Sequence, residues 1–196
     1  IISRVLDSVG KQTFKDYSCW VIDDCSSDGT TGFIKKHHPW VNCIVAQERS
    51  GPSKNRNTAI AMGHAEYIVT LDDDVELEQA TWLKEMLEFM EKNPKIGIAD
   101  SRLTPALSNT YPERYACTAA MIIRRAVFNE IGGFDETYFY PLEDTDFSLR
   151  AKRRGWAVGT NTAVNAFHWV NYTTKKLPDS FRRYHYWKNY IRTILK

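Results

Sequence analysis

Three consecutive acids, Asp72, Asp73 and Asp74, directly follow the apolar run 66–71. Carboxylates this close repel one another, so their ionised forms favour a compensating cation. Carboxylate oxygens suit hard cations such as Mg²⁺ and Mn²⁺, and Mg²⁺ usually adds water and substrate phosphates to one or two protein carboxylates. The run therefore indicates a metal or nucleotide site. A solvated turn that caps a helix is the alternative.

A second acid cluster, the pair Asp23 and Asp24, closes the apolar run 19–24. Farther along, Lys54 and Arg56 lie near an expected helix start, and helix N-termini and basic side chains both favour phosphate oxygens. A charged surface loop is the alternative, and a commoner one. The sequence has neither a GxGxxG nor a GxxxxGK[ST] pattern, so neither a dinucleotide-binding fold nor a P-loop NTPase is supported.

A third acid cluster, the pair Glu143 and Asp144, lies at the start of another expected helix. Acids at this position can simply cap the helix and offset its dipole. A carboxylate at a helix start inside a cleft can instead act as a general base toward a hydroxyl group. The residues by themselves favour neither interpretation.

The elements between these acids alternate apolar strands with helices. Strands are expected at 19–24, 41–46, 66–71, 96–100, 116–124 and 156–168, and helices from residue 30 to before Pro39, from the 50–53 loop to about Met62, and over 78–93, 126–131, 143–154 and 181–196. This alternation predicts a single α/β domain with a mixed, mostly parallel sheet flanked by helices. In open sheets of this kind, ligands bind beyond the carboxyl ends of the strands, where two of the acid clusters stand.

The composition is that of an ordinary soluble protein, because 43% of the 196 residues are apolar and 26% are charged. Disorder and a disulfide-dense miniprotein are therefore excluded. No apolar run approaches the roughly 20 residues that span a bilayer, and no secretory signal is visible, so we expect a cytoplasmic protein. The net charge of +2 divides into +6 over residues 175–196 and −4 over the rest, which argues against a broad nucleic-acid-binding face.

Several short motifs stand together in a specific order. They are residues 12–14 (QTF), 21–24 (VIDD) with 26–30 (SSDGT), 56–57 (RN), 66–68 (EYI) with 71–74 (LDDD), 131–136 (IGGFDE) and 143–147 (EDTDF). With them, the chain resembles the family 2 glycosyltransferases, which have the GT-A fold, over about residues 3–170. The resemblance implies a catalytic domain over 1–170 that begins after the family's first strand, and a basic aromatic helix over 171–196.

The resemblance also gives the first two acid clusters roles. It implies that Asp24, with Asp23 beside it, reads the pyrimidine base of a nucleotide. Asp73 resembles the residue that faces the ribose. Asp74 resembles the ligand of a divalent metal, Mn²⁺ or Mg²⁺, and Asp72 completes the DxD pattern.

Asp144 matches the catalytic base of inverting family members, with Glu143 beside it on the acceptor side. Arg56 or Lys54 would help the metal to stabilise the charge on a leaving diphosphate. His168 stands where many members have a histidine after the last core strand, and there it would ligate the metal or touch the diphosphate. A satisfied core histidine is the alternative.

Together these roles predict metal-dependent, inverting transfer of a sugar from a nucleoside-diphosphate sugar, in particular a UDP-sugar, to a saccharide or lipid-linked acceptor. A single base without an enzyme nucleophile favours inversion, and no Ser or Cys has the flanking residues of a covalent nucleophile. A sugar-phosphate nucleotidyltransferase is the alternative enzyme class, although no Gly-rich, Arg-containing loop is visible near the start. A nucleotide-sugar-binding fragment without turnover is the alternative outside the enzymes.

The basic tail has two interpretations. Phe181, Tyr184, Trp187 and Ile191 can share one face of the helix over 181–196, with Lys and Arg around it. We favour docking of this aromatic face on the domain. Alternatively, the helix lies peripherally on the inner face of an anionic membrane.

Overall fold

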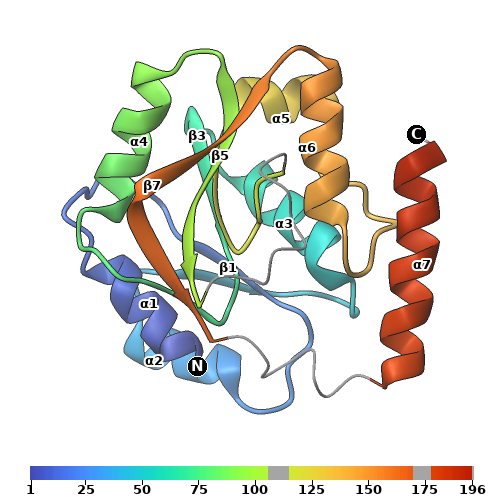
Figure 1. Cartoon of the computed structure of the whole chain (residues 1–196). Coiled ribbons are helices and arrows are strands. Elements are labelled where there is room, and N and C mark those ends of the chain that lie inside the picture. The colour runs from blue at the N-terminus through green and yellow to red at the C-terminus, as the bar shows by residue number, and fades with distance from the viewer. Residues whose placement is uncertain (106–114, 170–177, 196) are drawn as a thin grey trace.

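The larger of two β-sheets has five strands in the order β3-β6-β5-β7-β4. They are β3 (Tyr67–Leu71), β6 (Ala120–Arg124), β5 (Ile96–Thr104), β7 (Ala157–His168) and β4 (Val75–Leu77). β1 (Trp20–Asp23) and β2 (Asn42–Val45) form a separate parallel pair. The structure is a computed structural model that describes residues 1–105, 115–169 and 178–195 (Figure 1).

The mixed α/β sheet is confirmed, but the expectation that most of it is parallel is wrong for the described strands. Only β1–β2 and β5–β7 pair in parallel, whereas β3–β6, β5–β6 and β4–β7 are antiparallel. The reason is chain reversal. The turn of three acids after β3 sends β4 back against the direction of β3, so β4 meets β7 antiparallel. Strand–helix alternation in a sequence does not reveal such reversals.

Helices cover both faces of the five-stranded sheet. On one face, α4 (Trp82–Lys92) buries Trp82, Met86 and Met90 against Ala99 and Ile122. The other face lies under three helices, α3 (Gly51–Met62), α5 (Arg125–Ile131) and α6 (Glu143–Arg153). There the alternate strand residues Ile98, Met121 and Ile123 pack against Val127 and Phe147. Opposite faces take alternate residues because the strand is pleated.

Two elements were not expected from the sequence. β4 is only three residues long. α1 (Ile2–Gly10) buries Leu6 against Ile34 of α2 (Thr30–His37) and Val9 against the α4 side of the sheet. The apolar residues of α1 do follow helical spacing, so its signal is present in the sequence.

The C-terminal helix α7 (Asp179–Leu195) contacts the loop that precedes α6 and lies on the opposite side of the molecule from α4 (Figure 1). Residues 171–177 of the expected tail lie outside the described part. No described helix is both long and apolar enough to cross a membrane. The expected docking of the aromatic face holds for Phe181, whose ring packs edge-on against Phe139, but is wrong for Tyr184 and Trp187, which are 64% and 58% exposed. The buried face instead carries Asn189, whose amide nitrogen donates to backbone carbonyls, and Thr193, whose hydroxyl meets that of Tyr138.

Candidate functional site

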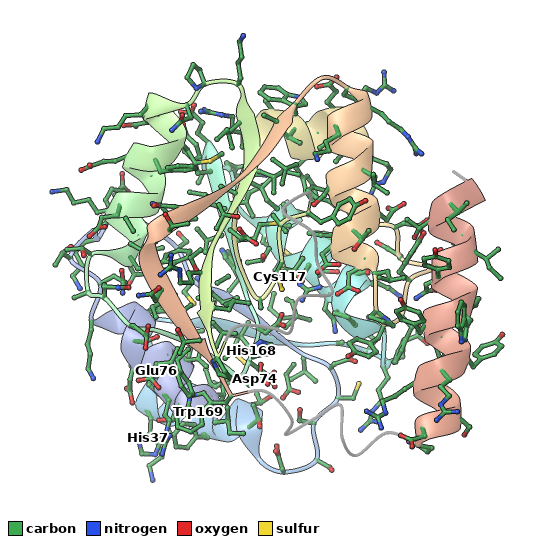
Figure 2. The ribbon with its side chains drawn as sticks, viewed as in Figure 1. His37, Asp74, Glu76, Cys117, His168 and Trp169 are labelled. Atoms are coloured by element: carbon green, nitrogen blue, oxygen red, sulfur yellow. The ribbon has the colours of Figure 1, made fainter. Side chains whose placement is uncertain are left out.

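The three acids Asp72, Asp73 and Asp74 form the turn that joins β3 to β4. The first residue of β4, Val75, pairs with His168, the last residue of β7, and the backbone N–H of Trp169 donates to the Asp74 carbonyl at 2.9 Å. This register brings His168 Nε2 to 3.1 Å from Asp74 Oδ1 (Figure 2). Strand pairing therefore brings together two residues that are far apart in the sequence.

Asp72, Asp74 and His168 could hold a metal ion. One ligand atom from each lies within 4.8 Å of the others. Burial opposes protonation of His168, but its hydrogen bond to Asp74 and the nearby acidic charges outweigh burial and raise its pKa. The cluster thus already attracts positive charge. Two carboxylates fit Mg²⁺ or Mn²⁺, and an imidazole nitrogen is compatible with a divalent transition metal.

Asp73 belongs to the same turn but contributes differently. Desolvation, followed by the charges of Asp74 and Asp72, raises the pKa of Asp73. Its carboxylate is not among the three clustered ligand groups. The Asp73 carboxylate can therefore contact a part of a bound molecule other than a metal held by that cluster.

Arg56 of α3 connects the acid turn to the start of α6. Its Nη2 lies 2.6 Å from Asp72 Oδ1 and its Nη1 lies 3.0 Å from Glu143 Oε1. These two acids raise the pKa of Arg56 although burial opposes its charge. Lys54 does not contact the acid turn or the start of α6. It is half-buried and pairs with Glu48 at 3.4 Å.

Asp144 lies in the first turn of α6 and is 8% exposed. Its Oδ1 accepts the backbone N–H of Thr145 at 2.7 Å. Among the described residues, no ion pair joins this carboxylate to a basic side chain. Burial, together with the charge of Glu143, raises the pKa of Asp144 to about 7. The group can therefore accept a proton near neutral pH.

Asp23 and Asp24 lie at and just beyond the end of β1, where both carboxylates accept hydrogen bonds. Asp23 is buried, and bonds from Ser26 and Thr31 overcome its desolvation and lower its pKa. Asp24 accepts the backbone N–H groups of Ser50 at 2.7 Å and Gly51 at 3.2 Å. Asp24 thereby anchors the start of α3, the helix that carries Arg56.

Cys117 and Asp100 were not identified from the sequence. The Cys117 backbone N–H donates to Asp100 at 2.9 Å, and the Thr160 hydroxyl donates to the other Asp100 oxygen at 2.7 Å. Burial and then the charge of Asp144 raise the pKa of the Cys117 thiol, so Cys117 lies in the electrostatic field of that acid. Neither residue belongs to a recognisable motif, and only the fold brings them near the site.

The mixed sheet, its helices and the acids near the end of β3 define a GT-A fold. A mannosyltransferase from Pyrobaculum calidifontis, solved with GDP-Man and Mn²⁺, matches 88% of this chain and 54% of its own with a TM-score of 0.73 and 19% identity. Staphylococcus aureus TarS (1–349), solved with UDP, matches 85% of this chain and 56% of its own with a TM-score of 0.69 and 21% identity. At these identities the similarity shows the fold.

The sequence narrows the class further: the chain belongs to glycosyl transferase family 2, whose profile matches residues 1–167. The poly(ribitol-phosphate) β-N-acetylglucosaminyltransferase TarS of S. aureus Mu50 is 31% identical over 97 residues, which are 47% of this chain and 17% of TarS. The N-acetylglucosaminyl-diphospho-decaprenol L-rhamnosyltransferase of Mycobacterium tuberculosis CDC 1551 is 29% identical over 104 residues, covering 53% and 33%. These relatives are thus matched over a third of their length or less.

Proposed function

We propose that this chain transfers a sugar from a nucleoside-diphosphate sugar to an acceptor hydroxyl, with a divalent metal and with inversion at the anomeric carbon. One observation carries the proposal. The guanidinium of Arg56 contacts both Asp72 of the acid turn and Glu143, the neighbour of Asp144. A candidate metal cluster and a candidate base therefore lie within the reach of one side chain.

In the proposed reaction, the oxygen of an acceptor hydroxyl attacks the anomeric carbon of the donor sugar. Its proton passes to a carboxylate oxygen of Asp144, whose pKa of about 7 suits this role. The bond between that carbon and the diphosphate oxygen breaks, and its electron pair leaves with the nucleoside diphosphate. One displacement without an enzyme nucleophile inverts the anomeric centre.

Charge on the leaving diphosphate needs compensation. Asp72, Asp74 and His168 would hold Mn²⁺ or Mg²⁺, which supplies electrostatic stabilisation of phosphate oxygens when bound. Arg56 adds a fixed positive charge at the edge of the same cluster. Lys54 pairs with Glu48, so its proposed contribution requires a side-chain movement toward the diphosphate.

For the nucleotide, we propose UDP, with Asp23 and Asp24 on the base side and Asp73 facing the ribose. The similarity to TarS, solved with UDP and with UDP-GlcNAc, supports a UDP-sugar donor. The similar mannosyltransferase was solved with GDP-Man, so GDP is the competing nucleotide. The two are distinguished by direct binding.

The proposed acceptor is a saccharide or a lipid-linked saccharide, in line with relatives whose names specify a polyol-phosphate polymer or a decaprenol-linked sugar. We further propose that α7 contacts an anionic membrane at its cytoplasmic face. Tyr184, Trp187, Ile191 and Ile194 form an exposed apolar face on α7, and Arg183 is exposed beside them. Aromatic side chains with polar tips and a neighbouring cation suit a lipid headgroup region.

The reaction class is tested by product analysis. Incubation with Mn²⁺ and a panel of UDP- and GDP-sugars should release the nucleoside diphosphate, faster when an acceptor is present. Release of pyrophosphate from a nucleoside triphosphate and a sugar phosphate would instead support a nucleotidyltransferase. Donor binding without release would indicate a binding module.

A further inference from the structure

The loop that precedes α6 delivers Asp144 to the site. It ends at Leu142, whose φ is 80°, in the left-handed region that a branched side chain rarely adopts. A non-glycine residue in this conformation is strained and persists only where its surroundings hold it. The contacts that hold residues 134–142 therefore decide where Asp144 points.

One side of this loop is held by α3. The Ser53 hydroxyl donates to the Tyr138 carbonyl at 2.9 Å. Asn57 makes two bonds with Phe134, donating to its carbonyl at 2.8 Å and accepting its N–H at 2.9 Å. Because α3 also carries Arg56, this side links the loop to the acid turn.

The other side is held by α7. Asn189 has 0% exposure, and its side-chain amide donates to two consecutive carbonyls, that of Pro141 at 2.7 Å and that of Tyr140 at 3.2 Å. One turn later, Thr193 Oγ1 lies 2.9 Å from the hydroxyl oxygen of the buried Tyr138. An amide nitrogen with two hydrogens can donate to both carbonyls, whereas a smaller apolar residue can donate to neither.

We propose that Asn189 is a positioning residue for the reaction: its amide fixes the Tyr140 and Pro141 carbonyls, holds Leu142 in its left-handed conformation and so aims Asp144. On this account α7 is part of the catalytic apparatus and not an appendage to it. The inference rests on the proposed role of Asp144 as the base. It reaches beyond that role because it assigns a reaction-determining contact to a helix whose other face is exposed.

The test compares Asn189→Ala and Asn189→Asp with Lys188→Ala, a truncation at the neighbouring position of the same helix. Rates are measured as nucleoside-diphosphate release from the best donor of a UDP- and GDP-sugar panel, and affinity as the calorimetric Kd for UDP with Mn²⁺. Both Asn189 variants should lower kcat at least tenfold while the donor KM and the UDP Kd change less than twofold. Lys188→Ala should leave kcat, the donor KM and the UDP Kd unchanged.

A double variant separates positioning from general damage. If Asn189 acts through Asp144, then Asn189→Ala should lower kcat little further in an Asp144→Asn background, because the group it aims is already gone. If the fold-loss of kcat in the double variant equals the product of the losses in the two single variants, the inference is overturned while the proposed base stays intact. Wild-type rates in Asp144→Asn itself would overturn the proposed base and the inference with it.

Thr193→Val provides a milder variant if Asn189→Ala does not fold. Valine keeps the shape of threonine but removes the hydroxyl that meets Tyr138, so kcat should fall about threefold with an unchanged UDP Kd. Backbone hydrogen exchange should also quicken over residues 134–145 and not in the β3–β4 turn. Unchanged kcat and unchanged exchange in this variant would contradict the inference.

Discussion

Burial of Asp144 controls the chemistry at the scale of single residues. Its pKa is raised from the usual 3.8 to about 7 by desolvation and by the charge of Glu143. Because proton acceptance requires the carboxylate, transfer should rise with pH through about 7. Since the folded-state pKa lies above the unfolded value, Asp144 favours folding most below about pH 4, and this stabilisation is lost as pH rises through about 7.

Asp144→Asn separates these two effects. The amide cannot accept the proton, so kcat should fall on the order of 10²- to 10⁴-fold. The amide also removes the cost of a buried charge, so the variant should melt several degrees above the wild type at pH 8 and differ less at pH 5. Thermal unfolding at pH 5 and pH 8 checks this. An equal change in Tm at both pH values would mean that burying the ionised Asp144 carboxylate does not destabilise the protein.

At the scale of elements, the start of α3 depends on Gly51. Its φ is 77°, and an added Cβ would lie 2.8 Å from a ring carbon of Phe139. Its N–H also donates to Asp24. Gly51 therefore contacts both the loop before α6, through Phe139, and the end of β1, through Asp24.

Gly51→Ala should therefore lower stability by about 1–3 kcal/mol and weaken UDP binding, because the helix must shift from Phe139 and from Asp24. Gly32→Ala in α2 is the matched control. An added Cβ there meets nothing within 4 Å, so this change should stabilise the protein by about 0.5–1 kcal/mol. Denaturant unfolding gives both free energies. An unchanged free energy of unfolding in Gly51→Ala would mean that the Phe139 ring moves away from the added Cβ without cost.

The sequence predicted these elements better than it predicted their pairing. Helical spacing in α4 and the acids that begin α6 are local signals, so both helices were expected close to their observed positions. The pairing of Val75 with His168 depends on a chain reversal and a strand of three residues, which leave no periodic pattern. Asn189 was missed for the same reason, since its partners are carbonyls almost 50 positions away.

At the scale of the whole molecule, α7 has two unlike faces. Asn189 and Thr193 are buried against the loop before α6, whereas Tyr184, Trp187 and Ile194 lie in solvent. The charge is equally uneven, because residues 175–196 sum to +6 and the remainder to −4. This asymmetry would orient the domain with α7 toward an anionic surface and the acidic body away from it.

Vesicle flotation tests this orientation. The protein should float with phosphatidylcholine vesicles that contain phosphatidylglycerol and less with pure phosphatidylcholine. Replacing both Trp187 and Ile191 with Ala should reduce binding at least tenfold, because each side chain loses about 1.5–3 kcal/mol of apolar burial. Phe33→Ala, at an exposed aromatic residue of α2, should have no effect. Equal flotation of the double variant would exclude α7 as the contact.

We propose that Asp72, Asp74 and His168 hold a divalent metal that nucleotide binding requires. Calorimetric titration of UDP with and without Mn²⁺ tests it directly, using Asp74→Ala and, as a control outside the cluster, Asp144→Asn. We predict Mn²⁺-dependent binding that Asp74→Ala abolishes and Asp144→Asn preserves. UDP affinity that is the same without Mn²⁺, or that is unchanged in Asp74→Ala, would show that this cluster does not hold a metal needed for UDP binding.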